Sequence, residues 1–130
     1  MRLNQVTVAA RDLAASIGFY ETLGLKLIVR SGHYARFECP DTDGGEPATF
    51  SLHLDPEARG VRDTVVYFEE DDLAAVVERL KAAGLAFESG PVEQDWLWRE
   101  AYLRDPTGNL ICLYSAGTIR RYPPWRLADR

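Results

Sequence analysis

The chain carries the same pattern twice, about sixty residues apart. The segment Val6–Leu13 runs from apolar residues into an Asp-Leu pair, and Val66–Leu73 does the same. A helical pattern follows each pair and ends at a Gly-Leu step, at Gly24 and at Gly84. Repetition at a fixed spacing indicates a repeat architecture, but two copies are too few for a solenoid. Two copies that face each other can enclose one cavity, so the repeat predicts a ligand site between two similar modules.

The composition suits one globular domain of 130 residues that is built from two half-domains. Hydrophobic residues make up 46% of the chain, which is enough for a sizeable core. The net charge of −5 argues against nucleic acid as a partner, because phosphate binding requires clustered cations. The one basic cluster, around Arg120 and Arg121, lies in the C-terminal tail.

Export and membrane signals are not apparent in the sequence. No apolar run approaches the length that spans a bilayer, and the first residues lack an apolar signal region. We therefore expect a cytoplasmic protein with no membrane partner, in which Cys39 and Cys112 are free thiols.

The periodicity of each half predicts the order β-α-β-β-β. In the first half Asp12 is a good N-cap for the helix and Gly24 a good C-terminal stop. In the second half Asp71 or Asp72 caps the helix and Gly84 stops it. The predicted strands cover 3–9, 25–29, 34–39, 49–54, 64–68, 85–88, 98–103 and 110–114. The predicted fold class is α+β, with module one at 1–54, a linker at 55–62, module two at 63–117 and a tail at 118–130.

The doubled order, the Asp-Leu openings and the turn Asp105–Leu110 resemble the vicinal oxygen chelate superfamily over Leu3–Ser115. That superfamily includes glyoxalase I, extradiol dioxygenases, fosfomycin-resistance enzymes and bleomycin-resistance proteins. The resemblance implies a curved, cup-like sheet around one cavity. It does not specify a reaction, because function depends on the site that a fold carries.

In the metal-dependent members the ligands come from matched strand positions. Carried over residue by residue, these positions fall on Gln5, on Val65, on Cys112 and on His53, with Ser51 as the alternative to His53. Val65 offers no donor atom and Gln5 is a weak neutral donor, whereas such ions prefer imidazole and carboxylate groups. We therefore expect no tightly held metal ion and no cofactor.

Strand alternation predicts which side chains face the cavity. Tyr34, Arg36 and Glu38 also alternate, and they either line the other side or are solvated. The predicted ligand-binding residues are Gln5, Thr7, Tyr67, Trp98, Tyr102, Cys112 and Tyr114.

Two polar residues are catalytic candidates. His53 serves as a base or ligand, or is simply a hydrogen-bonded strand histidine. Glu100 serves as a base or holds a cationic group, or forms a salt bridge to an arginine such as Arg36 or Arg99. A further alternative is that His53 and Glu100 together form an unconventional metal site.

The tryptophans and the second cysteine have competing interpretations. Trp98 is expected to form a wall of the pocket rather than to fill the core, and Trp96 fits either a pocket or a contact role. Cys112 is expected to be a small buried hydrophobic residue.

The leading hypothesis is a binding protein that holds a small apolar or aromatic molecule without metal. The alternative is a metal-dependent lyase, isomerase or dioxygenase with a rearranged ligand set. The tail segment Tyr122–Trp125 suggests an interface, so we expect a homodimer with Trp125 partly buried.

Overall fold

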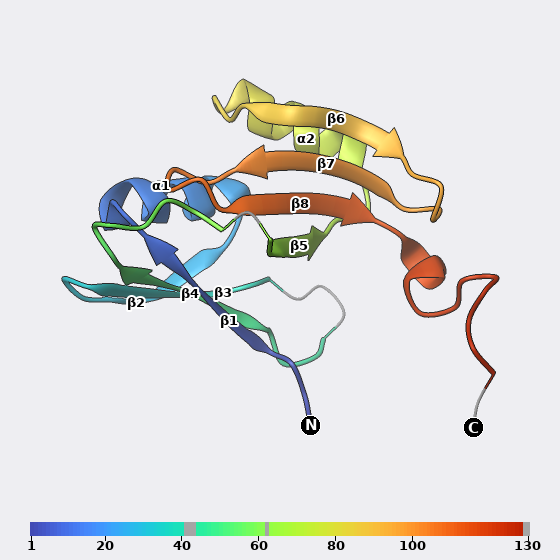
Figure 1. Ribbon diagram of the computed structural model, residues 1–130, viewed down its shortest axis with the longest axis horizontal. Coiled ribbons are helices and arrows are strands. Elements are labelled where there is room, and N and C mark those ends of the chain that lie inside the picture. Colours follow the sequence, from blue (N-terminus) through green and yellow to red (C-terminus); the bar gives the residue numbers. More distant parts are fainter. Residues whose placement is uncertain (41–43, 62, 129–130) are drawn as a thin grey trace. The chain divides into compact units, whose positions relative to one another are not determined.

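The structure is a computed structural model that describes residues 1–40, 44–61 and 63–128. Within these ranges the chain forms two four-stranded sheets, two α-helices and one short 3₁₀ helix (Figure 1). Two compact units are present: unit 1 is Met1–Thr64 with Asp105–Asn109, and unit 2 is Val65–Arg104 with Leu110–Arg130. The predicted loop at 41–47, position 62 of the predicted linker and the end of the tail at 129–130 lie partly or wholly outside the described residues.

The sheet of unit 1 has the strand order β1-β4-β3-β2. β1 and β4 are parallel, and the other neighbouring strands are antiparallel. The elements are β1 (Gln5–Ala10), α1 (Leu13–Leu23), β2 (Lys26–Arg30), β3 (Tyr34–Glu38) and β4 (Thr49–Leu54).

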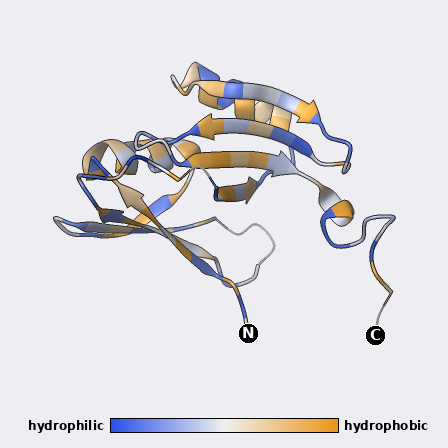
Figure 2. Ribbon diagram, in the orientation of Figure 1, coloured by the Kyte–Doolittle hydropathy of each residue, from blue (hydrophilic) through white to orange (hydrophobic). Residues whose placement is uncertain are grey.

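The sheet of unit 2 repeats this arrangement as β5-β8-β7-β6, with β5 and β8 parallel. The elements are β5 (Val65–Glu69), α2 (Leu73–Ala82), β6 (Phe87–Glu93), β7 (Arg99–Arg104), β8 (Leu110–Ser115) and the 3₁₀ helix η1 (Gly117–Arg120). The predicted α+β class and the duplicated β-α-β-β-β order are confirmed. Most of β8 is coloured as hydrophobic in Figure 2, as expected for a strand inside a sheet.

Both helices begin where the sequence predicts. The carboxylate of Asp12 accepts a hydrogen bond from the backbone N–H of Ala15 at 3.0 Å, and Asp72 accepts one from Ala75 at 3.2 Å. Each cap satisfies one of the N–H groups that a helix start leaves unpaired. α1 ends at Gly24, whose φ of 118° is left-handed and therefore suits glycine. No helix in the described ranges is long and apolar enough to cross a membrane.

The core of unit 1 lies between α1 and one face of its sheet. Tyr20 is fully buried, and its ring centroid lies 4.5 Å from that of Phe50 and 5.9 Å from that of Phe37. Alternation places the side chains between these residues on the opposite face of the same strands. That opposite face is therefore turned away from α1.

The largest differences between predicted and observed strand boundaries are in β1 and β6. Leu3 is 89% exposed and precedes β1, which begins at Gln5. β6 runs to Glu93 rather than ending at Glu88. Gly90 and Pro91 are accommodated because β6 is an edge strand whose pairing with β7 shifts register, so Pro91 costs no interior ladder bond.

Candidate functional site

Unit 1 carries a polar sheet face, made of alternate residues of β1, β4 and β3. The register pairs Thr7 with Ser51 and Ser51 with Arg36, which brings the three strands' polar side chains to one face. The face consists of Gln5, Thr7, Tyr34, Arg36, Glu38, Thr49, Ser51 and His53. The predicted residues Gln5, Thr7 and His53 thus share one face, and all three are exposed.

A hydrogen-bonded network crosses this face. The Gln5 amide nitrogen donates to Ser51 Oγ at 2.9 Å, and its carbonyl oxygen accepts from the Thr49 hydroxyl. The Tyr34 hydroxyl donates to Ser51 Oγ at 2.7 Å, and Tyr34 Oη in turn accepts from Arg36 Nε at 2.9 Å. The hydrogen bond with Ser51, and secondarily Arg36, lowers the pKa of Tyr34 although partial desolvation opposes the shift. The Tyr34 phenol therefore loses its proton more easily than an ordinary tyrosine.

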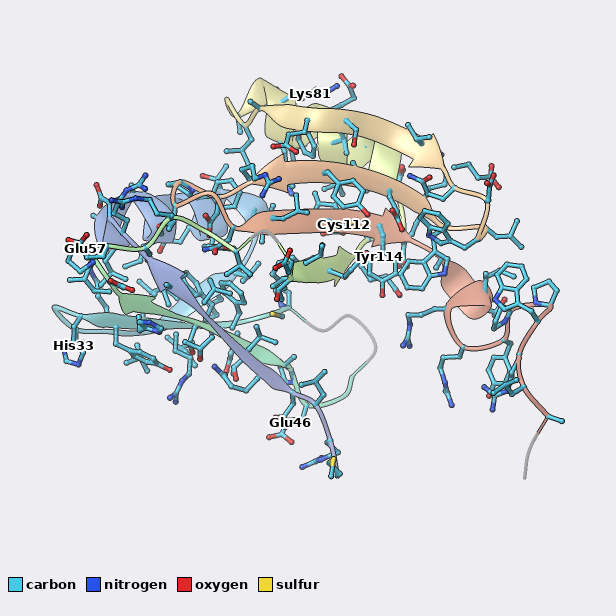
Figure 3. The ribbon with its side chains drawn as sticks, viewed as in Figure 1. His33, Glu46, Glu57, Lys81, Cys112 and Tyr114 are labelled. Carbon is cyan, nitrogen blue, oxygen red and sulfur yellow. The ribbon has the colours of Figure 1, made fainter. Side chains whose placement is uncertain are left out.

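Unit 2 carries the larger group of predicted ligand-binding residues. The register pairs Cys112 with both Tyr67 and Tyr102, and it pairs Tyr114 with Glu100. Trp98 comes directly before β7 in the same alternation. Figure 3 shows Cys112 and Tyr114 along β8. The structure therefore brings together five of the predicted residues on one face of the second sheet, with Trp98 at its end.

Three aromatic rings form what we call the aromatic surface: Tyr67, Trp98 and Tyr114. Trp98 stacks on Tyr114 with centroids 4.6 Å apart and an interplanar angle of 15°. Tyr67 meets both rings edge-on, at 5.9 Å from Trp98 and 5.7 Å from Tyr114. Tyr67 is 44% exposed, whereas Tyr114 is buried. Stacked and edge-to-face rings of this kind are mutually stabilising.

Glu100 is buried beside this surface, with 1% of its area exposed. Oε2 accepts a hydrogen bond from the Trp96 indole N–H at 2.8 Å, and Oε1 accepts one from the Tyr102 hydroxyl at 2.7 Å. No arginine or lysine of the described residues forms an ion pair with it. The alternative of a salt bridge to Arg36 or Arg99 is therefore wrong for the described residues: two neutral donors hold the carboxylate instead.

The thiol and phenols near Glu100 remain protonated at neutral pH. Burial, and then the Glu100 charge, raise the pKa of Cys112 to about 12. Burial and the hydrogen bond with Glu69 raise the pKa of Tyr114 to about 12. Burial and the hydrogen bond to Glu100 also raise the pKa of Tyr102. The expected buried, unactivated Cys112 is confirmed, since its side chain is fully buried; its contact with a ligand stays a prediction.

The residues at the implied metal-ligand positions do not fit a metal ion. Val65 is a hydrocarbon side chain, and Cys112 holds its proton. The register equates Ser51, rather than His53, with Cys112, because Ser51 pairs with Thr7 as Cys112 pairs with Tyr67. A weak amide, a hydroxyl, a hydrocarbon and a protonated thiol are a poor donor set for a divalent ion. Among the described residues no three His, Cys, Asp or Glu side chains gather into a possible metal site.

The two catalytic candidates fall in different units. His53 is in unit 1, exposed near the end of β4, and Glu100 is in unit 2. His33, labelled in Figure 3, is exposed in the turn before β3.

Ser51 and Trp96 carry roles that the sequence alone does not settle. In the sequence Ser51 looks like any other strand residue. In the structure the pairing of β1 with β4 places it within hydrogen-bond distance of Gln5. Trp96 lies in the turn after β6, where Leu97 adopts a left-handed φ of 70°. The short spacing Trp96–Glu100 is the one sequence signal that links the indole to the carboxylate.

Comparison with known proteins identifies the family. A family model described as the Glyoxalase/Bleomycin resistance protein/Dioxygenase superfamily matches residues 2–113. An uncharacterized protein of Mycolicibacterium smegmatis (strain ATCC 700084 / mc(2)155) is 33% identical over 114 residues, which is 87% of this chain and 92% of the relative.

Solved structures share the fold. A glyoxalase/bleomycin resistance protein/dioxygenase from Nocardioides has a TM-score of 0.76 and 25% identity, over 98% of this chain and 90% of that one. A bleomycin-binding protein complexed with bleomycin has a TM-score of 0.69 and 23% identity, over 88% of this chain and 98% of that one. At this identity the second likeness shows the fold alone. From the duplicated module, the family match and the mycobacterial relative, we conclude that the chain belongs to the Glyoxalase/Bleomycin resistance protein/Dioxygenase superfamily.

Proposed function

We propose that this protein binds a small, planar aromatic molecule on the aromatic surface, without help from a metal ion. The observation that carries the proposal is the parallel stack of Trp98 on Tyr114, with Tyr67 edge-on to both rings. The half-buried Trp98 of this stack offers a flat apolar ring to a ligand, and Tyr67 stands perpendicular at its edge. Rings that are already packed against one another lose little side-chain entropy when a ligand docks.

A polar group next to the rings supports the same function. Glu100 and the hydroxyl of Tyr102 form a hydrogen-bonded pair next to the stack. Small-molecule sites combine mostly apolar walls with a few polar groups that orient the ligand. We therefore assign Trp98 as the stacking wall, Tyr67 as the exposed edge and the half-buried Tyr102 hydroxyl as the polar group that orients the ligand. Glu100, which is 1% exposed, holds that hydroxyl in place.

One structural neighbour is consistent with this proposal. The bleomycin-binding protein shares the fold and was solved with an organic ligand bound. Because the identity is 23%, the neighbour supports the general class of function, the binding of an organic molecule, and does not indicate which molecule.

The proposal predicts that binding depends on the π-system of the ligand. The probes are 2-naphthol and decahydro-2-naphthol, which share a carbon skeleton and a hydroxyl but differ in planarity and aromaticity. We expect 2-naphthol to bind and to raise the melting temperature, because a ligand of the folded state stabilises it, and the saturated analogue to bind more weakly.

Trp98→Ala tests the wall directly. We expect it to weaken 2-naphthol binding by about 1–3 kcal/mol, or roughly five- to 150-fold, in isothermal titration calorimetry. Trp98→Phe keeps an aromatic ring and is expected to retain part of the affinity. Leu3→Ala is the control, since Leu3 is 89% exposed and lies outside both the aromatic surface and the tail.

Two results would refute this function. One is the same affinity in Trp98→Ala as in the unchanged protein. The other is a large loss of stability in Trp98→Ala with no binding defect, which assigns Trp98 to the core.

Metal independence has its own test, because Val65 and Cys112 occupy two of the implied ligand positions. We expect 2-naphthol affinity to be unchanged after dialysis against EDTA. Elemental analysis that finds near-stoichiometric zinc, nickel, iron or manganese in protein purified without chelator would contradict the proposal.

A further inference from the structure

The Ser51–Tyr34 pair on the polar face of unit 1 is bordered by two hydrogen-bond donors, Gln5 and Arg36. The Thr49 hydroxyl satisfies the Gln5 carbonyl, which turns the Gln5 amide nitrogen toward Ser51 Oγ. The guanidinium Nε of Arg36 donates to Tyr34 Oη. Neither an amide nitrogen nor a guanidinium accepts hydrogen bonds, so both groups only donate into the Ser51–Tyr34 pair.

The Ser51–Tyr34 pair therefore has one hydroxyl proton that lacks an acceptor. Two hydroxyl protons are present, but only one of them is used in the 2.7 Å hydrogen bond between the two oxygens. Whichever oxygen donates, the other proton has no acceptor among the hydrogen bonds that the described residues form. In the structure Tyr34 donates to Ser51, so the unused proton is that of Ser51, which is fully buried. Reversal of this bond, with Ser51 donating to Tyr34, frees the phenol proton for an acceptor outside, because Tyr34 is partly exposed.

Arg36 adds a positive charge at the same place. It is exposed, and no carboxylate of the described residues forms an ion pair with it. Its guanidinium carbon lies 5.4 Å from the centre of the Tyr34 ring, while Nε bonds to the phenol oxygen. These two contacts hold the side chain, and the N–H groups on its terminal nitrogens remain for a ligand.

We propose that Tyr34 and Arg36 bind the carboxylate of a small organic ligand on the polar face of unit 1. The guanidinium supplies the charge and the phenol supplies the surplus hydrogen bond, while Ser51 and Gln5 position the phenol. A carboxylate is the acceptor that best matches a guanidinium edge next to a hydroxyl donor. The site is built from residues of unit 1 alone and includes none of the residues of the aromatic surface, so it does not depend on the function proposed above.

The titration of Tyr34 is consistent with this site. Its pKa is lowered by Ser51 and Arg36, as expected for an oxygen surrounded by donors. The other titratable groups on this face are Glu38 on the same strand and His53 on β4, which pairs with Tyr34. A bound carboxylate adds negative charge next to the phenol and therefore raises the pKa of Tyr34 again.

The experiment uses non-aromatic probes, so that the aromatic surface plays no part. Cyclohexanecarboxylate is the ligand and cyclohexanecarboxamide its neutral control, both at constant ionic strength. Inorganic phosphate is a separate arm that distinguishes another oxyanion from a carboxylate. We expect the carboxylate to bind and the amide and phosphate to bind much more weakly.

Matched variants assign the binding to this face. Arg36→Gln is expected to weaken carboxylate binding by roughly tenfold or more, and Tyr34→Phe by roughly two- to tenfold. Arg2→Gln makes the same change in net charge at an exposed arginine and is expected to bind normally. Equal affinity in folded Arg36→Gln and in Arg2→Gln would overturn the proposal, as would phosphate binding more tightly than the carboxylate.

A spectroscopic readout separates binding from a merely structural role. Tyrosinate absorbance followed against pH should show an early transition that Tyr34→Phe removes. Cyclohexanecarboxylate should shift that transition to higher pH in the unchanged protein, and cyclohexanecarboxamide should not. A transition that is insensitive to the carboxylate counts against the site.

Discussion

The hydroxyl of Tyr20 donates a 2.7 Å hydrogen bond to Oδ2 of Asp105, a residue of the turn between β7 and β8. The other carboxylate oxygen accepts three backbone N–H groups, from Thr107, Gly108 and Asn109, at 2.9–3.0 Å. Asp105 is 4% exposed. The turn whose sequence supported the family resemblance is therefore structural, and it is anchored to α1 within unit 1.

Tyr20→Phe should destabilise the protein, because it leaves a buried carboxylate oxygen with one donor fewer. We expect the free energy of unfolding to fall by about 1–3 kcal/mol, measured by urea denaturation with an unchanged slope. Tyr122→Phe is the control, since Tyr122 is exposed. Equal stabilities of the two variants would show that the bond contributes nothing.

The same residue makes stability depend on pH. Burial, and then the Asp105 charge, raise the pKa of Tyr20 in the folded state. The unfolded tyrosine loses its proton near pH 10, so the contribution of Tyr20 is complete below about pH 10 and falls above it. We expect the stability of the unchanged protein to fall more steeply above pH 10 than that of Tyr20→Phe, as followed by urea midpoints at each pH.

Leu97 should store backbone strain in the turn before β7. Its φ of 70° is left-handed, and its side chain is 41% exposed, so little burial offsets the cost. Leu97→Gly is expected to raise the free energy of unfolding by up to about 1 kcal/mol, and Leu97→Val to lower it by about 1 kcal/mol, because β-branched residues avoid this region. Thermal and urea unfolding measure both; a destabilised glycine variant would contradict the prediction.

Glu100 should control the reactivity of Cys112. Burial is the larger cause of the raised pKa of this thiol, about 12, and the Glu100 charge is the second. Glu100→Gln removes that charge, so we expect the pKa of Cys112 to fall and its alkylation by iodoacetamide to accelerate at pH 9 to 10, as assigned by peptide mass spectrometry. Cys39 is the internal control, because burial alone raises its pKa. A change of equal size at both cysteines would indicate general loosening of the fold instead.

The tail should take part in self-association. Trp125 is 58% exposed and Tyr122 56% exposed in the single chain, and Arg126 lies 4.8 Å over the Tyr122 ring. Exposed aromatic and arginine side chains are typical of interfaces. We predict a homodimer by light scattering at micromolar concentration, and Trp125→Ala should shift it toward monomer; a monomeric unchanged protein would refute this.

Local features could be predicted because their causes are local. Asp12 and Asp72 cap their helices through bonds to residues three positions away, and Gly24 supplies the left-handed stop. Alternation correctly grouped Tyr67 with Cys112 and Tyr102, since side chains on a strand alternate whatever the strand pairs with. The length of β6 was harder to predict, because register shifts against β7 accommodate Gly90 and Pro91.

The sequence by itself therefore determined the α+β class, the duplicated β-α-β-β-β order and the faces of the strands. Only the tertiary structure decided which polar atoms meet. Ser51 accepts a hydrogen bond from Gln5 because β1 pairs in parallel with β4. Trp96 donates a hydrogen bond to Glu100 because the turn at Leu97 brings the indole next to the carboxylate. The physical reason is that strand register follows from burying one whole face of a sheet, and no short stretch of sequence contains both partners of such a contact.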